Sequence, residues 1–167
     1  MGTQLFAVVR SLVYAAGFYL VWWWALVSAR PLDRRIGLAL PEWARLPGLV
    51  LVVLGAALAL WCIGAFALVG RGTPAPFDAP REFVAVGPYR YVRNPMYLGA
   101  LLILVGVALF LGWPSALAVA AGFVLLAHVF VLLYEEPTLE RRFGASYREY
   151  KRAVERWLPR APERGSR

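Results

Sequence analysis

The sequence predicts an all-α integral membrane protein with about four transmembrane helices, the last two forming a C-terminal hairpin, followed by amphipathic cytoplasmic helices. Hydrophobic residues make up 60% of the chain, and seven of its 167 residues are Trp. The mean hydropathy is +0.59, which is far above that of an ordinary soluble domain. Long uncharged runs alternate with short polar connectors. Residues 1–167 are therefore expected to form a single membrane domain.

The first two spans are predicted at residues 5–29 and 46–69. Residues 12–29 carry no charge and are numerous enough to cross a hydrocarbon core of roughly 30 Å at about 1.5 Å per residue. Three consecutive Trp near the end of this run resemble an interfacial belt. The polar connector 30–45 follows, and glycines and alanines in the second span favour close helix packing in lipid.

The remaining apolar stretch must fold back on itself. Residues 98–134 are apolar apart from His128, and one helix of this length would reach roughly 55 Å. The sequence Gly112-Trp113-Pro114-Ser115 is typical of a turn with Pro at the start of the next helix. The third and fourth spans are thus predicted at 95–111 and 114–134, the former being short for a complete crossing.

A polar motif, GPYRYVRNPMYLG at residues 87–99, precedes the third span. Asn94 is a favoured N-cap, and Pro95 suits the first helical position because its missing amide hydrogen would have no partner there. The free amides and the helix dipole favour an anionic group in the preceding loop. Residues 70–94 are therefore predicted to form one wall of a site, although a capped membrane helix with snorkelling arginines is an alternative.

A second polar motif, Glu135-Glu136-Pro137, ends the fourth span. Two adjacent carboxylates there are costly unless they are solvated, paired or bound to a ligand. The arginines of the 87–99 motif should lie on the same membrane face, although simple solvation at the interface is the alternative. His128 is the single histidine, and a lone membrane histidine more often packs or forms hydrogen bonds than reacts, so its role stays open.

Residues 137–158 are predicted to form amphipathic helices interrupted at Gly144. Aromatic and aliphatic side chains recur at helical spacing, while basic side chains fill the other face. The basic face is expected to contact anionic phospholipid headgroups. This binding also explains the net charge of +8 without nucleic acid. The single cysteine, Cys62, lies in an apolar run and predicts neither a disulfide nor a metal site.

Charge also predicts the orientation of the chain. Four arginines at 71, 81, 90 and 93 and all nine Lys and Arg after residue 140 fall on one side, against four in the connector 30–45. The side with more basic residues, which includes both termini, is expected to be cytoplasmic.

These motifs resemble the superfamily of isoprenylcysteine carboxyl methyltransferases and phospholipid methyltransferases. The resemblance covers roughly residues 72–159 and includes the 87–99 motif, the double glutamate, Phe143-Gly144-Ala145-Ser146-Tyr147-Arg148-Glu149-Tyr150 and Trp157-Leu158-Pro159. Asn94 replaces the usual histidine, as in bacterial members, which points to a bacterial inner membrane. This replacement removes a titratable group from the motif.

The resemblance implies a methyltransferase that uses S-adenosylmethionine, releases S-adenosylhomocysteine and acts on a membrane lipid or a prenylated substrate. It implies that Arg93 and Glu135 take part in catalysis. Arg93 or the helix amides would hold the methionine carboxylate, and the glutamates would bind the ribose hydroxyls or the ammonium group. The implied cofactor-binding residues are Tyr89, Arg93, Asn94, Tyr97, Leu98, Gly99, Glu135 and Glu136.

Several acceptors and two other classes of protein stay open at this point. An isoprenylcysteine-like carboxylate is favoured, and a phosphatidylethanolamine-type amine is the alternative. Related sterol reductases use NADPH and carry an acidic residue where this chain has Ala100. A non-catalytic lipid-binding protein would bind neither cofactor. The oligomeric state is not predicted.

Overall fold

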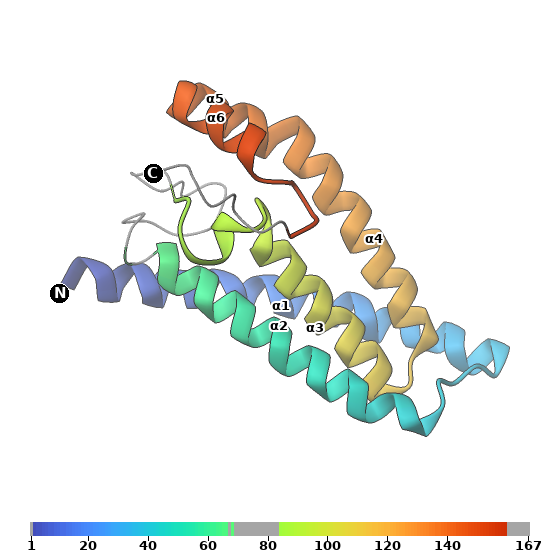
Figure 1. The fold of residues 1–167 in the computed structure, drawn as a ribbon. Helices are drawn as coiled ribbons and strands as arrows, with labels where there is room; N and C mark the ends of the chain where they lie inside the picture. The colour runs from blue at the N-terminus through green and yellow to red at the C-terminus, as the bar shows by residue number, and fades with distance from the viewer. Residues whose placement is uncertain (1, 67, 69–83, 160–167) are drawn as a thin grey trace. The chain divides into compact units, whose positions relative to one another are not determined.

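The computed structural model describes residues 2–66, 68 and 84–159, with side chains from Val9 onward. Within these ranges the chain is helical and contains no strand, which confirms the all-α class (Figure 1). The helices are α1 (Gly2–Ile36), α2 (Arg45–Ala65), α3 (Pro95–Leu111), α4 (Pro114–Phe130), α5 (Glu136–Phe143) and α6 (Ala145–Ala153).

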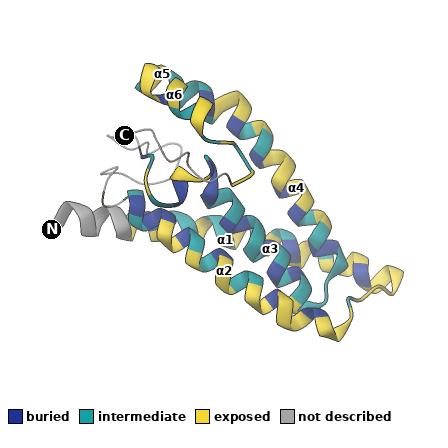
Figure 2. Ribbon diagram, in the orientation of Figure 1, coloured by how far each residue is buried: buried dark blue, intermediate teal, exposed yellow. Residues whose placement is uncertain are grey.

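Among the described residues, three helical stretches are long and apolar enough to cross a membrane: Val9–Ile36, Glu42–Ala65 and Pro114–Phe143. The fourth predicted span, α3, is a shorter apolar helix. Many large apolar side chains on α1, α2 and α4 are exposed, as the yellow bands in Figure 2 show. Extensive apolar exposure along helices of this length fits an integral membrane protein.

The chain divides into two compact units. The first unit consists of Met1–Ser11, Leu58–Met96 and Phe130–Arg167, and the second consists of Leu12–Ala57 and Tyr97–Val129. The expectation of a single membrane domain stays a prediction.

In the second unit, α2 and α3 approach each other at glycines. A Cβ placed on Gly48 would lie 2.7 Å from the Gly106 carbonyl oxygen, and one on Gly55 would lie 2.6 Å from the Gly99 carbonyl oxygen. Backbones can come this close only where side chains are absent. Gly48 and Gly55 therefore serve helix packing, whereas a Cβ on Gly64 would meet no described residue within 4 Å.

The turn between α3 and α4 lies where the sequence predicts it, with Gly112 at a φ of +72°. Beyond the turn, the buried Asp33 accepts hydrogen bonds from the Ser115 backbone N–H at 2.8 Å and from Ser115 Oγ at 2.7 Å. A carboxylate at the start of α4 satisfies donors that have no partner within the helix. Because Asp33 makes this contact from α1, that helix continues to Ile36 instead of ending at the predicted residue 29.

In the first unit, a π-helical turn, Val131–Glu135, connects the end of α4 to α5. Pro137 lies just beyond this turn, and proline both lacks an amide hydrogen and crowds the carbonyl four residues earlier. A widened turn accommodates this disturbance, and such turns are frequent at functional sites. Glu135 is half-buried in the π turn, whereas Glu136 is buried at the start of α5.

The described part of the predicted cofactor loop contains a 3-10 turn, Gly87–Arg90. Tyr89 of this turn is buried against Cys62, Ala65 and Val84. Residues 69–83 of the predicted loop and of the second span lie outside the described residues, as does residue 67.

Candidate functional site

Arg93 and Glu136, which are far apart in the sequence, form an ion pair in the first unit. Arg93 lies two residues before the start of α3, and Glu136 is the first residue of α5. Arg93 Nη1 is 3.0 Å from Glu136 Oε1, and their side chains are only 10% and 7% exposed. The cationic loop and the double glutamate therefore converge, as the sequence predicts.

Two further cations share the Glu136 carboxylate. Arg156 Nε donates to Oε1 at 2.6 Å and Arg156 Nη2 donates to Oε2 at 3.2 Å, which makes a bidentate pair. Lys151 Nζ lies 3.5 Å from Oε2. The hydrogen bond to Glu136 raises the pKa of Arg156 above its ordinary value. Three cations therefore surround one buried carboxylate, and Lys151 also pairs with Glu140 at 3.2 Å, so basic and acidic groups alternate around the site.

The segment after α6 is hydrogen-bonded to the 87–99 motif. The backbone N–H of Arg93 donates to the Glu155 carbonyl oxygen at 2.8 Å, and Asn94 Nδ2 donates to the Arg156 carbonyl oxygen at 3.1 Å. Tyr150 Oη donates to the Tyr89 carbonyl oxygen at 2.7 Å. These bonds replace helical ones, so the predicted helical region 137–158 ends at Ala153 and the chain becomes extended at the next residue.

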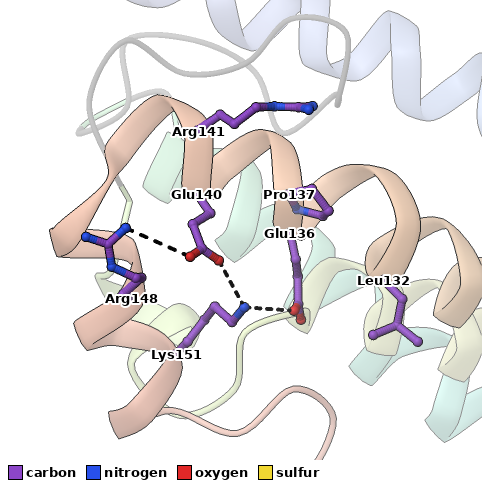
Figure 3. Close-up of a pocket in the computed structure, with 7 residues that line it drawn as sticks. All are labelled: Leu132, Glu136, Pro137, Glu140, Arg141, Arg148 and Lys151. Atoms are coloured by element: carbon purple, nitrogen blue, oxygen red, sulfur yellow. Dashed lines mark hydrogen bonds and ion pairs between the residues drawn. The ribbon is translucent and has the colours of Figure 1, made fainter.

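A pocket of about 520 Å³ opens beside Glu136. Figure 3 shows Lys151 between the carboxylates of Glu136 and Glu140, with Arg148 beyond Glu140. The pocket is lined by Leu132, Glu136, Pro137, Glu140, Arg141, Arg148 and Lys151. Its volume lies within the range of small-molecule sites, roughly 300–1,000 Å³, and its walls offer charges of both signs.

Arg93 has unused hydrogen-bonding capacity. Its Nε and Nη1 atoms are buried and donate no hydrogen bond within the described part of the chain, the contact of Nη1 with Glu136 being an ion pair. A buried guanidinium N–H without an acceptor is costly. An additional acceptor such as a carboxylate would remove that cost.

Tyr147 of α6 is buried near Glu136 and Arg93. Tyr147 is 3% exposed, and burial, followed by the charge of Glu136, raises its pKa to about 12. The carboxylate of Glu135 contributes to the same rise. Both glutamates therefore act electrostatically on the same region as Arg93.

The structure brings together some of the predicted cofactor-binding residues and leaves others untested. Arg93, Asn94, Tyr89 and Glu136 belong to one hydrogen-bonded cluster, and Glu135 adjoins it. Tyr97, Leu98 and Gly99 belong to the second unit, where the Tyr97 ring lies 6.4 Å from that of Phe123. The roles assigned to all these residues stay predictions.

Arg156, Lys151 and Tyr150 complete the cluster, although the sequence does not single them out. Their helical spacing indicates an amphipathic helix with a solvated basic face. The signal that could have identified Arg156 is its place next to Trp157-Leu158-Pro159, a motif that carries the family resemblance.

Comparison with known proteins places these motifs in a family. The phospholipid methyltransferase family matches residues 43–146, which is more than half of the chain. An uncharacterized protein of Haemophilus influenzae is 44% identical over 63 residues, which are 38% of this chain and 100% of that protein. No solved structure matches the chain. The family match contains both polar motifs and ends before Tyr150, Lys151 and Arg156.

Proposed function

The chain belongs to the phospholipid methyltransferase family of membrane methyltransferases that act on lipids, and from this premise we propose a more specific activity. The protein transfers a methyl group from S-adenosylmethionine to a lipid or prenylated acceptor at the cytoplasmic membrane face. The observation that carries this proposal is the pairing of Arg93 with Glu136 beside a pocket of suitable size.

The charges present fit this cofactor. S-adenosylmethionine supplies an electrophilic methyl group on a sulfonium, and it also carries a carboxylate and an ammonium group. Arg93 would hold the carboxylate, because its buried Nε lacks an acceptor within the described residues. Glu135 would bind the ribose hydroxyls or the ammonium group. Glu136, which already faces three cations, would hold those cations in place.

The acceptor decides whether the protein must also move a proton. A carboxylate acceptor, as in an isoprenylcysteine, is ionised at neutral pH and needs no base. Holding two reactants in line can then contribute about 7–11 kcal/mol in favourable cases. We propose this acceptor class on the resemblance of the motifs.

An amine acceptor is the second candidate, and the matched family favours it because that family methylates phospholipids. An amine must lose a proton before or during methyl transfer. Glu135 is the proposed base, since it adjoins the cluster and is half-buried. A base of this kind would be dispensable for a carboxylate acceptor.

We place the protein in the bacterial inner membrane, with both termini in the cytoplasm where S-adenosylmethionine is available. The excess of basic residues on that side supports this orientation. Anionic phospholipid headgroups are the proposed partners of the exposed basic side chains on α5 and α6.

Isothermal titration of the purified protein in lipid nanodiscs tests the proposed cofactor. S-adenosylmethionine and S-adenosylhomocysteine should bind, whereas NADPH should not. Arg93→Ala and Glu135→Ala should each abolish binding while the protein stays folded by circular dichroism. Binding of NADPH alone would indicate a reductase, and binding of none of the three would indicate a non-catalytic protein.

Radiolabelled methyl donor and lipid extracts would then distinguish the acceptors. A methyl ester releases its label as methanol in mild base, whereas an N-methyl group keeps it. Base-labile product supports the carboxylate acceptor. A base-stable product would instead indicate an amine acceptor and would contradict the proposed carboxylate acceptor.

A further inference from the structure

Arg156 is the cation with the most complete contact to Glu136. It contributes two hydrogen bonds, at 2.6 and 3.2 Å, whereas Arg93 and Lys151 contribute single ion-pair contacts. A bidentate guanidinium fixes both the position and the plane of a carboxylate. Glu136 therefore owes its orientation chiefly to Arg156.

The backbone around Arg156 is itself fixed to the loop that carries Arg93. The Arg93 backbone N–H donates to the Glu155 carbonyl oxygen, and Asn94 Nδ2 donates to the Arg156 carbonyl oxygen. Bonds on both sides of the Cα make Arg156 a fixed part of the site and not a loose terminal side chain. Its side chain is 28% exposed and covers the Glu136 side chain, which is 7% exposed.

The Oε1 atom of Glu136 connects the two arginines. It accepts from Arg156 Nε and lies 3.0 Å from Arg93 Nη1. Without Arg156, the Glu136 carboxylate would lose its bidentate partner and keep only the single contacts to Arg93 and Lys151, so it could rotate and shift the Arg93 guanidinium. The Arg93 Nε, which has no acceptor within those residues, would then no longer be held in place for an anion.

We infer that Arg156 is a positioning residue, which orients Arg93 through Glu136 so that Arg93 can bind the carboxylate of the methyl donor. This inference rests on the proposed function. It concerns the amino-acid part of the donor and not its adenosine part.

Binding measurements in nanodiscs test this role with three ligands. S-adenosylmethionine and S-adenosylhomocysteine both carry the carboxylate, whereas 5′-methylthioadenosine lacks the whole amino-acid end. Arg156→Ala should weaken the first two at least tenfold and change the affinity for 5′-methylthioadenosine less than twofold. Arg156→Lys should weaken binding almost as much as Arg156→Ala, because an ammonium cannot form the bidentate pair.

A double-mutant cycle tests whether Arg156 acts through Glu136. The variant carrying both Arg156→Ala and Glu136→Gln should bind S-adenosylmethionine within twofold of Glu136→Gln alone. Arg152→Ala is the matched control, since it removes an exposed arginine of α6 and should stay within twofold of the unmodified protein. All titrations are made well below the lowest unfolding temperature in the set.

The outcomes separate the two proposals. If the unmodified protein binds neither S-adenosylmethionine nor S-adenosylhomocysteine, the proposed function fails and this inference fails with it. If it binds both and Arg156→Ala has no effect, only the positioning role is wrong. An equal loss of affinity for 5′-methylthioadenosine in Arg156→Ala would also overturn the positioning role, because it would indicate a general structural effect. If the affinity losses of Arg156→Ala and Glu136→Gln multiplied in the double variant, Arg156 would act independently of Glu136, which would overturn it as well.

Discussion

At the scale of single residues, the main feature of the site is a buried carboxylate whose charge is compensated by nearby cations. Glu136 is buried at the end of an apolar helix, where an ionised carboxylate is stable only with close partners. Arg93, Arg156 and Lys151 supply these partners from two other segments of the chain. The same contacts therefore connect the loop, α5 and the segment after α6 into one polar cluster.

Loss of the Glu136 charge should be costly. Glu136→Gln leaves the nearly buried Arg93 without a counter-ion and weakens the bidentate pair with Arg156, so we expect a loss of about 3 kcal/mol. Glu140→Gln is the matched control, because the Glu140 side chain is 35% exposed and a partly solvated pair contributes less than about 1 kcal/mol. Thermal unfolding in detergent measures both, and equal losses would contradict the prediction.

Tyr147 should make stability dependent on pH in the alkaline range. Its pKa is about 12 in the folded protein and about 10 in an unfolded chain, so the unfolded state loses its proton first. The contribution of Tyr147 to stability should thus be constant below about pH 10 and fall as the pH rises toward about 12. Unfolding temperatures of Tyr147→Phe should fall less steeply over this window.

The matched change Tyr91→Phe, at a tyrosine that is 43% exposed, controls for loss of a hydroxyl group. The Tyr147 assignment would be wrong if Tyr147→Phe retained the full slope.

Residue patterns predict that the arginines of the loop and the double glutamate lie on the same membrane face, but not that Arg93 pairs with Glu136 or that Arg156 joins them. Charges next to apolar helices are informative because they cannot stay unpaired in lipid. Arg156 lies in an amphipathic segment, where basic residues are ordinary and usually solvated. Only tertiary hydrogen bonds to residues 93 and 94 end that helix early and bring Arg156 to Glu136.

At the scale of helices, local signals predict the beginnings of elements better than their ends. Pro95 and Pro114 both begin helices as the sequence indicates, because proline at the first position depends only on local geometry. The end of α1 depends on Asp33, whose partner Ser115 is distant in the sequence. The π turn before α5 likewise has no clear local signature beyond Pro137.

The different surroundings of two glycines, Gly106 in the α2–α3 contact and Gly122 on α4, predict opposite effects of substitution by alanine on stability. A Cβ on Gly106 would lie 2.6 Å from the Gly48 carbonyl oxygen and 2.8 Å from the Val52 backbone nitrogen, neither of which can move without shifting a helix. Gly106→Ala should therefore cost about 1–3 kcal/mol. A Cβ on Gly122 of α4 would meet nothing within 4 Å.

Gly122→Ala should consequently be neutral or stabilising by up to about 1 kcal/mol, because alanine loses less backbone entropy in a helix. Thermal unfolding of both variants in the same detergent measures the difference. A stabilising Gly106→Ala would contradict the packing seen between α2 and α3.

At the scale of the whole molecule, the distribution of basic residues and the number of membrane crossings must predict the same side of the membrane for each polar segment. Basic residues are concentrated in residues 70–94 and after residue 140, which predicts a cytoplasmic position for both regions. Arg35 precedes the second predicted span, and Arg152 follows the fourth. Three crossings between them place the two arginines on opposite sides of the membrane, but only if the short helix α3 crosses completely.

Cysteine labelling decides this number. Arg35→Cys and Arg152→Cys introduce thiols at exposed positions of α1 and α6, whereas the native Cys62 is fully buried and should not react. In spheroplasts, a membrane-impermeant maleimide should label Arg35→Cys directly and Arg152→Cys only after permeabilisation. The same result for both thiols, whether labelled or protected, would mean that α3 enters the bilayer without crossing it, and the reverse pattern would contradict the predicted orientation. Labelling of Arg152→Cys in intact spheroplasts would place α6 outside the cytoplasm. Because S-adenosylmethionine is cytoplasmic, this result would also contradict the proposed cofactor site.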